Sequence, residues 1–82
     1  MGDVGNEAPM QSIPVTVWVG KAGLGSVVEE LADQLEDRTT VKVKFLRAAR
    51  AGEETETLAE RLAERVEAQV RGVRGHTAVL GR

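Results

Sequence analysis

The chain has 82 residues, a formal net charge of −2 and no cysteine. This length allows one small domain with a modest hydrophobic core, and the lack of cysteine excludes disulfides and thiolate metal sites. The sequence has no apolar run long enough to cross a bilayer and does not begin with the apolar stretch of a signal peptide. We therefore expect a cytoplasmic protein without a membrane partner.

The charged residues are separated by sign along the chain. Acidic residues dominate segments 27–38 and 53–67, whereas segments 39–52 and 68–82 contain bases and no acid. This pattern predicts acidic helices together with basic strands and loops. A domain with little net charge still attracts phosphate if the two signs are separated in space. The alternative is that the acids only solvate helix surfaces and the bases have no shared role.

Residues 1–13 show no periodicity and are predicted to be a disordered tail, which leaves 14–82 as the domain. Pro14 places the start of the first strand near Val15, since proline is tolerated at the first position of a strand. Val15, Val17 and Val19 alternate with Thr16 and Trp18, which predicts valines on the core side and the other two on the opposite face.

A glycine-rich loop, Gly20-Lys21-Ala22-Gly23-Leu24-Gly25, follows this strand. Ser26 and Glu29 have the spacing of a capping box, and Val28, Leu31, Ala32 and Leu35 continue at helical spacing. The loop is thus predicted between the carboxyl end of a strand and the amino end of a helix. Backbone amides and the helix dipole favour an anion there, most often a phosphate.

The remaining elements complete a small α+β fold. Val41 to Phe45 alternates as a second strand with Lys42 and Lys44 facing away from the core. Residues 47–52 are predicted to be a loop, followed by a helix that begins between residues 53 and 57, with a second capping box at Thr57 and Glu60, and ends at Gly72. A hairpin with its turn at Gly75-His76 closes the chain. The expected fold has the order β-α-β-α-β-β and two layers, a four-stranded mixed sheet with the helices on one face. The other face would gather Trp18, Lys42 and Lys44, unless the tail covers Trp18.

The sequence offers little for catalysis. His76 is predicted in a turn, Ser26 at a helix cap, and Glu29, Glu30 and Asp33 on a solvated helix face. The loop is neither a Walker sequence nor a dinucleotide fingerprint, because its glycines are spaced G-x-x-G-x-G. We expect no catalytic residue, no metal and no cofactor. A G-x-x-G loop with a cation is instead suited to close approach by a sugar-phosphate chain, as in KH domains, which place the loop between two helices.

Three segments resemble the CRM domain (chloroplast RNA splicing and ribosome maturation), whose stand-alone prokaryotic members are called YhbY-like. Gly20, Lys21, Gly23 and Leu24 match its G-K-x-G-L loop, and residues 41–44 match its V-K-V-K strand. The closing G-x-T-x-V-L-Y-R hairpin of the family is matched by Gly75, Thr77, Val79, Leu80 and Arg82. Two departures are the missing basic N-terminal helix of bacterial members and Gly81 in place of a tyrosine.

The resemblance implies an RNA-binding domain with a fold like the C-terminal domain of translation initiation factor three. It also implies an association with ribosomal RNA and with maturation of ribosomal subunit precursors. We expect a monomer that contacts structured RNA through the following residues: Gly20, Lys21, Ala22, Gly23, Leu24, Gly25, Lys42, Lys44, Arg47, Arg50 and Arg74. Two alternatives stay open. One is an Alba-like protein that binds DNA in chromatin, and the other is a protein-interaction module that uses its acidic helices.

Overall fold

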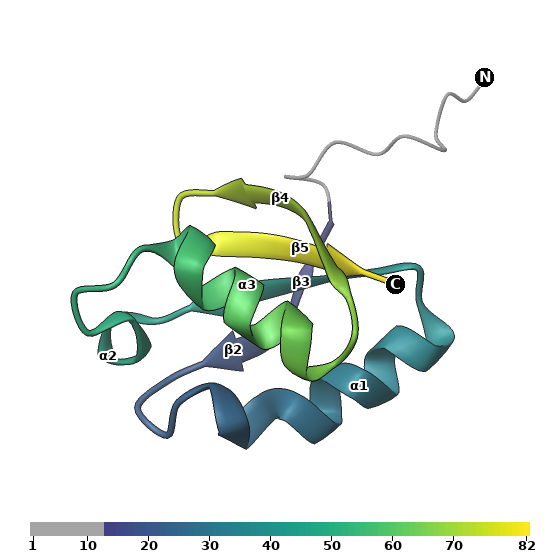
Figure 1. The fold of residues 1–82 in the computed structure, drawn as a ribbon, viewed down its shortest axis with the longest axis horizontal. Coiled ribbons are helices and arrows are strands. Elements are labelled where there is room, and N and C mark those ends of the chain that lie inside the picture. The colour runs from purple at the N-terminus through teal and green to yellow at the C-terminus, as the bar shows by residue number, and fades with distance from the viewer. Residues whose placement is uncertain (1–12) are drawn as a thin grey trace.

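The computed structural model describes residues 13–82 as two layers, a four-stranded sheet with helices packed on one face (Figure 1). The predicted order of the main elements and the α+β fold class are confirmed. The predicted tail lies outside the described residues, apart from Ile13. The elements are β2 (Val15–Val19), the 3-10 helix η2 (Leu24–Val27), α1 (Val28–Asp37), β3 (Thr40–Phe45), α2 (Arg47–Arg50), α3 (Thr55–Arg65), β4 (Gln69–Arg74) and β5 (Thr77–Gly81).

The strands lie in the order β2-β3-β5-β4. β2 and β3 are parallel and are joined through α1, whereas β5 is antiparallel to both β3 and β4. The β4–β5 hairpin turns at Gly75-His76 as predicted, with φ 58 at Gly75, a left-handed value that glycine adopts without strain. The closing hairpin therefore places its second strand, β5, beside β3 and leaves β4 at the edge.

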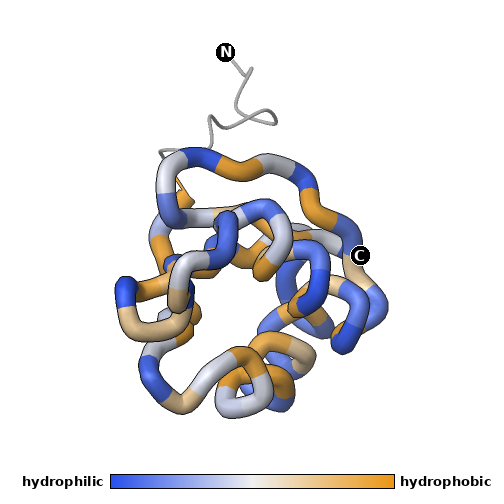
Figure 2. The backbone as a smooth tube through the Cα atoms, turned by 60° about the vertical axis from the view of Figure 1, so that its left-hand side comes forward, coloured by the Kyte–Doolittle hydropathy of each residue, from blue (hydrophilic) through white to orange (hydrophobic). Residues whose placement is uncertain are grey.

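The core lies between the sheet and the helices. β2 and β3 contribute five fully buried side chains, those of Val17, Val19, Val41, Val43 and Phe45. The helices add the predicted stripes: Leu31 and Leu35 from α1, and Leu58, Ala59, Leu62 and Ala63 from α3. Hydrophobic and hydrophilic residues are interspersed along the chain (Figure 2), and in β3 buried residues alternate with less buried ones, as expected for a sheet with one covered face.

An irregularity in β2 changes the predicted alternation at its start. Val17 is paired with Val43 in the core, but Val15 is paired with Lys42 on the opposite face. The extra residue, Thr16, donates its hydroxyl hydrogen to the side-chain oxygen of Gln34 on α1, at 2.5 Å. The prediction that Val15 faces the core and Thr16 the opposite face of the sheet is thus wrong, because the bulge turns Thr16 toward α1.

Neither predicted capping box forms. Ser26 lies inside η2, where its hydroxyl donates to the carbonyl of Gly23 at 2.7 Å, and α1 begins later, at Val28. α3 begins at Thr55 with Glu54 at its N-cap, so Thr57 is already helical. Both patterns fit a helix start by spacing, but the chain reaches helical geometry at other residues. The segment predicted as a loop at residues 47–52 also contains the short helix α2.

α3 ends seven residues earlier than Gly72, the predicted end. The amide of Ala68 donates to the carbonyl of Ala63 (2.8 Å) and that of Glu67 to the carbonyl of Glu64 (3.3 Å), with φ 57 at Glu67. This is a Schellman motif, which usually has glycine at the left-handed position. Because Glu67 occupies that position, the sequence shows no stop signal, and Val70 continues the helical spacing although it belongs to β4.

The side chain of Arg82 links the C-terminal end of α3 to the end of β5. Its Nε and Nη2 both donate to the carbonyl of Val66, at 3.1 and 3.0 Å. The carbonyl of Arg82 in turn accepts from Nη2 of Arg71 at 3.1 Å. The side chain of Arg71 also lies beside Gly81. A Cβ added to Gly81 would lie only 2.7 Å from the carbonyl oxygen of Thr39. The backbone therefore has no room for the family's tyrosine at this position.

Replacing Glu67 with glycine should stabilise the protein by about 0.5–1 kcal/mol, because relief of the left-handed strain exceeds the entropy that glycine adds to the unfolded chain. Urea unfolding followed by circular dichroism measures the change. Glu64→Gly, inside the same helix, should instead destabilise by about 1 kcal/mol. Equal effects of the two changes would contradict the Schellman motif.

Removing the Arg82 side chain (R82A) should cost about 1–2 kcal/mol of unfolding free energy, because a charged donor to the helix end is lost. R61A is the matched control, since Arg61 forms an exposed ion pair with Glu53 at 2.9 Å. Exposed pairs of this kind contribute roughly 0–1 kcal/mol. If R61A lowered the free energy of unfolding as much as R82A in the same urea titration, the Arg82 side chain would not be what stabilises the end of α3.

Candidate nucleic-acid interface

The glycine loop forms a tight turn that presents Lys21 to solvent. The amide of Gly23 donates to the carbonyl of Gly20 at 2.9 Å, which leaves Lys21 and Ala22 exposed at the tip. Gly23 has φ 87, which L side chains rarely adopt, and its carbonyl accepts from both the amide and the hydroxyl of Ser26. The second glycine of G-x-x-G is thus required by backbone geometry.

This geometry modifies the predicted anion site. The amide of Gly23 is used to close the turn. The 3-10 helix η2 begins within the loop, at Leu24, and α1 follows only at Val28. Because the effect of a helix dipole falls off within the first turn, α1 contributes less field at the loop than a helix beginning at Ser26 would. The exposed charge of Lys21 and the glycine backbone therefore carry more of any phosphate contact than the helix does.

Segments distant in the sequence surround the loop. Because β2 and β3 are parallel, the loop and α2 emerge at the same end of the sheet (Figure 1). Leu46 donates its amide to the carbonyl of Val19 at 2.8 Å, and its Cδ1 would lie 3.7 Å from a Cβ added to Gly20. At the other side, Nη1 of Arg65 would lie 3.5 Å from a Cβ added to Gly25. Arg65 was not predicted, because its position beside Gly25 depends on how α3 packs against the rest of the fold.

The face of the sheet opposite the helices gathers three of the predicted cations. In register across the four strands, Trp18 pairs with Lys44, Lys44 with Thr77, and Thr77 with Arg74. Lys42 lies in the neighbouring row, paired with Val15 and Val79. We call this surface the open face. The prediction that it gathers Trp18, Lys42 and Lys44 is confirmed, and Trp18 is 52% exposed. The predicted tail, the alternative cover for Trp18, lies outside the described residues except for Ile13.

The two predicted arginines of α2 differ in their surroundings. Arg47 is exposed at the start of the helix, at the loop end of the sheet. Arg50 is half-buried and lines a cleft with Glu53, Glu54 and Glu56 beside the β4–β5 turn. Its Nε is enclosed without a hydrogen-bond partner in the described chain. The structure thus places Arg50 in a cleft that three acids also line.

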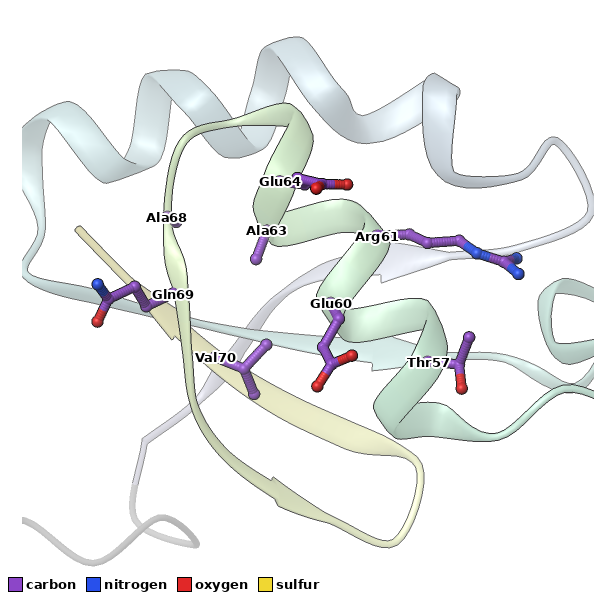
Figure 3. Close-up of a pocket in the computed structure, with 8 residues that line it drawn as sticks. All are labelled: Thr57, Glu60, Arg61, Ala63, Glu64, Ala68, Gln69 and Val70. Atoms are coloured by element: carbon purple, nitrogen blue, oxygen red, sulfur yellow. The ribbon is translucent and has the colours of Figure 1, made fainter.

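The helices present acidic groups on the other side of the molecule. The exposed residues of α1 include Glu29, Glu30, Asp33, Glu36 and Asp37. A shallow groove between α3 and β4 has Glu60 and Glu64 in its wall, and Figure 3 shows Glu60 extending between the two elements while Arg61 points away. The charges are therefore divided by layer, acidic over the helices and basic over the open face.

Within residues 13–82, no three His, Cys, Asp or Glu side chains are grouped so that they could hold a metal ion. In the same part of the chain, no helix is long and apolar enough to span a bilayer.

Gly23→Ala should destabilise the protein by about 1–2 kcal/mol, because alanine is strained at this left-handed φ. Gly25→Ala is the matched control. Gly25 lacks a positive φ, and a Cβ there meets only the mobile end of Arg65 at 3.5 Å. Thermal unfolding of both variants checks the turn geometry. A Gly25→Ala variant as unstable as Gly23→Ala would count against it.

The comparisons with known proteins agree with this architecture. A model of the CRS1 / YhbY (CRM) domain matches residues 7–82. A Methanocaldococcus jannaschii protein named probable RNA-binding protein is 42% identical over 66 residues. The match covers 80% of this chain and 49% of that protein, so the chain spans about half the length of this curated relative. The solution structure of a hypothetical Staphylococcus aureus protein has a TM-score of 0.71 and 27% identity, over 88% of this chain and 74% of that one. The chain belongs to the CRS1 / YhbY (CRM) domain family, as its loop, second strand and closing hairpin predicted.

Proposed function

We propose that this protein binds structured RNA through the glycine loop and the open face, without catalysis. Membership of the CRM family and the name of the Methanocaldococcus jannaschii relative, probable RNA-binding protein, support RNA as the ligand. The observation that carries the proposal is the position of Lys21, which projects from a glycine turn at the same sheet end as the exposed cation Lys44. The loop and the open face then form one continuous contact surface.

The contacts are mainly with the RNA backbone. Glycines in the loop let the sugar-phosphate chain approach the main chain closely, and Lys21 supplies the attracting charge. Lys42, Lys44 and Arg74 extend the positive surface over the open face, while Arg65 adds a charge beside Gly25. The acidic helical layer repels RNA from the opposite side, so that charge alone orients the protein on its ligand.

Ribosomal RNA is the ligand that we propose, with the protein acting as a cytoplasmic monomer on precursors of the ribosomal subunits. The sequence resemblance to YhbY-like proteins supports this assignment. Recognition by backbone and shape suits a folded RNA whose grooves display phosphates and 2′-hydroxyls, and it needs no base-specific code. The same contacts predict a strong dependence of affinity on salt, because each neutralised phosphate releases counterions.

Lys21→Glu should weaken binding to a ribosomal RNA fragment roughly tenfold or more and should lower the slope of log affinity against log salt by about one. Arg38→Glu is the matched control. It makes the same change of charge at the amino end of β3, away from the loop, and should change affinity little. Fluorescence anisotropy of labelled RNA at several salt concentrations measures both variants, and circular dichroism confirms their fold.

Other outcomes distinguish the alternatives. If Lys21→Glu and Arg38→Glu weaken binding equally, the loop is not the contact. If duplex DNA binds more tightly than the RNA and the protein is dimeric, an Alba-like role replaces the proposal. If no nucleic acid binds even at low salt, and amide shifts with a basic ribosomal protein map to α1 and α3, the acidic helices are the functional surface.

A further inference from the structure

We propose that Trp18 is a stacking platform for an unpaired base of the bound RNA, next to the nucleotide whose phosphate lies at the glycine loop. This inference rests on the proposed function and adds a contact of a different kind. The loop would hold the backbone, whereas Trp18 would hold a base.

Trp18 lies on the open face, outside the hydrophobic core. Its side chain is 52% exposed, although its neighbours Val17 and Val19 are fully buried. Among the described residues, the other large hydrophobic side chain that is exposed is Leu46, at 40%. Leu46 packs beside Gly20, at the end of the strand that carries Trp18. Both exposed hydrophobic groups thus flank the glycine loop, which indicates a contact surface and not a gap in the core.

The residues beside Trp18 favour a nucleotide over a peptide as the occupant. Trp18, Lys44, Thr77 and Arg74 form one row across the open face, with neighbouring strands about 4.8 Å apart. An aromatic ring beside an ammonium group matches a base and a phosphate. The hydroxyl of Thr77 donates to the carbonyl of Arg74 at 2.8 Å, so its oxygen is left to accept from a sugar hydroxyl. Stacking on an aromatic ring beside a positive groove is how many single-strand binders hold bases without reading their sequence.

The distance to the loop fits the same ligand. Trp18 precedes Gly20 by two residues, which is about 7 Å along a strand at the usual rise of about 3.3 Å per residue. A chain whose phosphate is held at Lys21 therefore has its neighbouring nucleotide within reach of Trp18. Because a base inside a duplex is already stacked on its neighbours, the platform requires an unpaired nucleotide beside a stem.

The chain contains a single tryptophan, so its intrinsic fluorescence reports on this position alone. The experiment titrates the full chain with two RNA hairpins of identical stem, one blunt and one with a short single-stranded extension. The extended hairpin should quench the fluorescence of Trp18 and the blunt hairpin should not. Trp18→Ala should bind the extended hairpin about 5- to 150-fold more weakly, with the salt slope unchanged, because stacking releases no counterions.

Two controls separate stacking from folding and from the loop. Trp18→Phe keeps an aromatic face and should restore most of the affinity, while amide NMR spectra show that the variants are folded. Lys21→Glu should weaken both hairpins, whereas Trp18→Ala should weaken the extended one alone. That contrast would establish two separable contacts.

Three results would overturn the inference. If Lys21→Glu weakens binding but Trp18→Ala binds both hairpins as the wild type does, RNA binding stands and the platform fails. If neither hairpin binds, the proposed function fails with it. If poly-glutamate quenches Trp18 and the extended hairpin does not, the open face docks an acidic protein segment.

Discussion

The parallel pairing of β2 with β3 is the constraint on which the rest of the structure depends. It brings the glycine loop, Leu46 and α2 to one end of the sheet, because parallel strands end on the same side. It also sets Trp18 beside Lys44 on the face that the helices leave uncovered. A slip of one residue in this register would bury the lysine and expose Val43. The apolar core and the candidate binding surface are thus fixed by the same pairing.

The bulge at Thr16 keeps that register compatible with the helix layer. By turning toward Gln34 on α1, Thr16 ties the edge strand to the helix that follows it. The two residues before Gly20 keep strict alternation, so that Val19 anchors the strand in the core while Trp18 stays outside. The loop therefore begins from a rigid position. A rigid base matters for a phosphate contact, since an ordered loop pays less entropy when it binds.

The division of charge between layers follows from the same packing. Helices pack by their apolar stripes, and the acids of α1 and α3 are left on the outer surface. The open face has no helix above it in the described chain, so its bases remain opposite to those acids. Although the net charge is only −2, the protein therefore has two surfaces of opposite charge. Phosphate attraction depends on this local separation and not on the total.

The end of α3 shows how tertiary contacts complete the site. The side chain of Arg82 donates to the carbonyl of Val66, and the chain turns at Glu67, which has a positive φ. Arg65, at the end of α3, lies beside Gly25. These steps join the second helix to a loop that follows the first strand. A helix continuing to Gly72 would have taken the first four residues of β4 out of the sheet. The cation nearest to Gly25 is therefore a product of packing between distant segments.

The sequence by itself determined the strand and helix order, the glycine turn, the hairpin and the family, because these depend on local periodicity and on residues a few positions apart. It also indicated the open face, since alternation in two strands places Trp18, Lys42 and Lys44 together once their pairing is assumed. The helix starts, the end of α3, the bulge at Thr16, and the positions of Arg50 and Arg65 were decided by the tertiary structure. In each case the local pattern permits more than one geometry. The choice is made by hydrogen bonds such as those of Gln34 and Arg82, whose partners are brought near only when the chain folds.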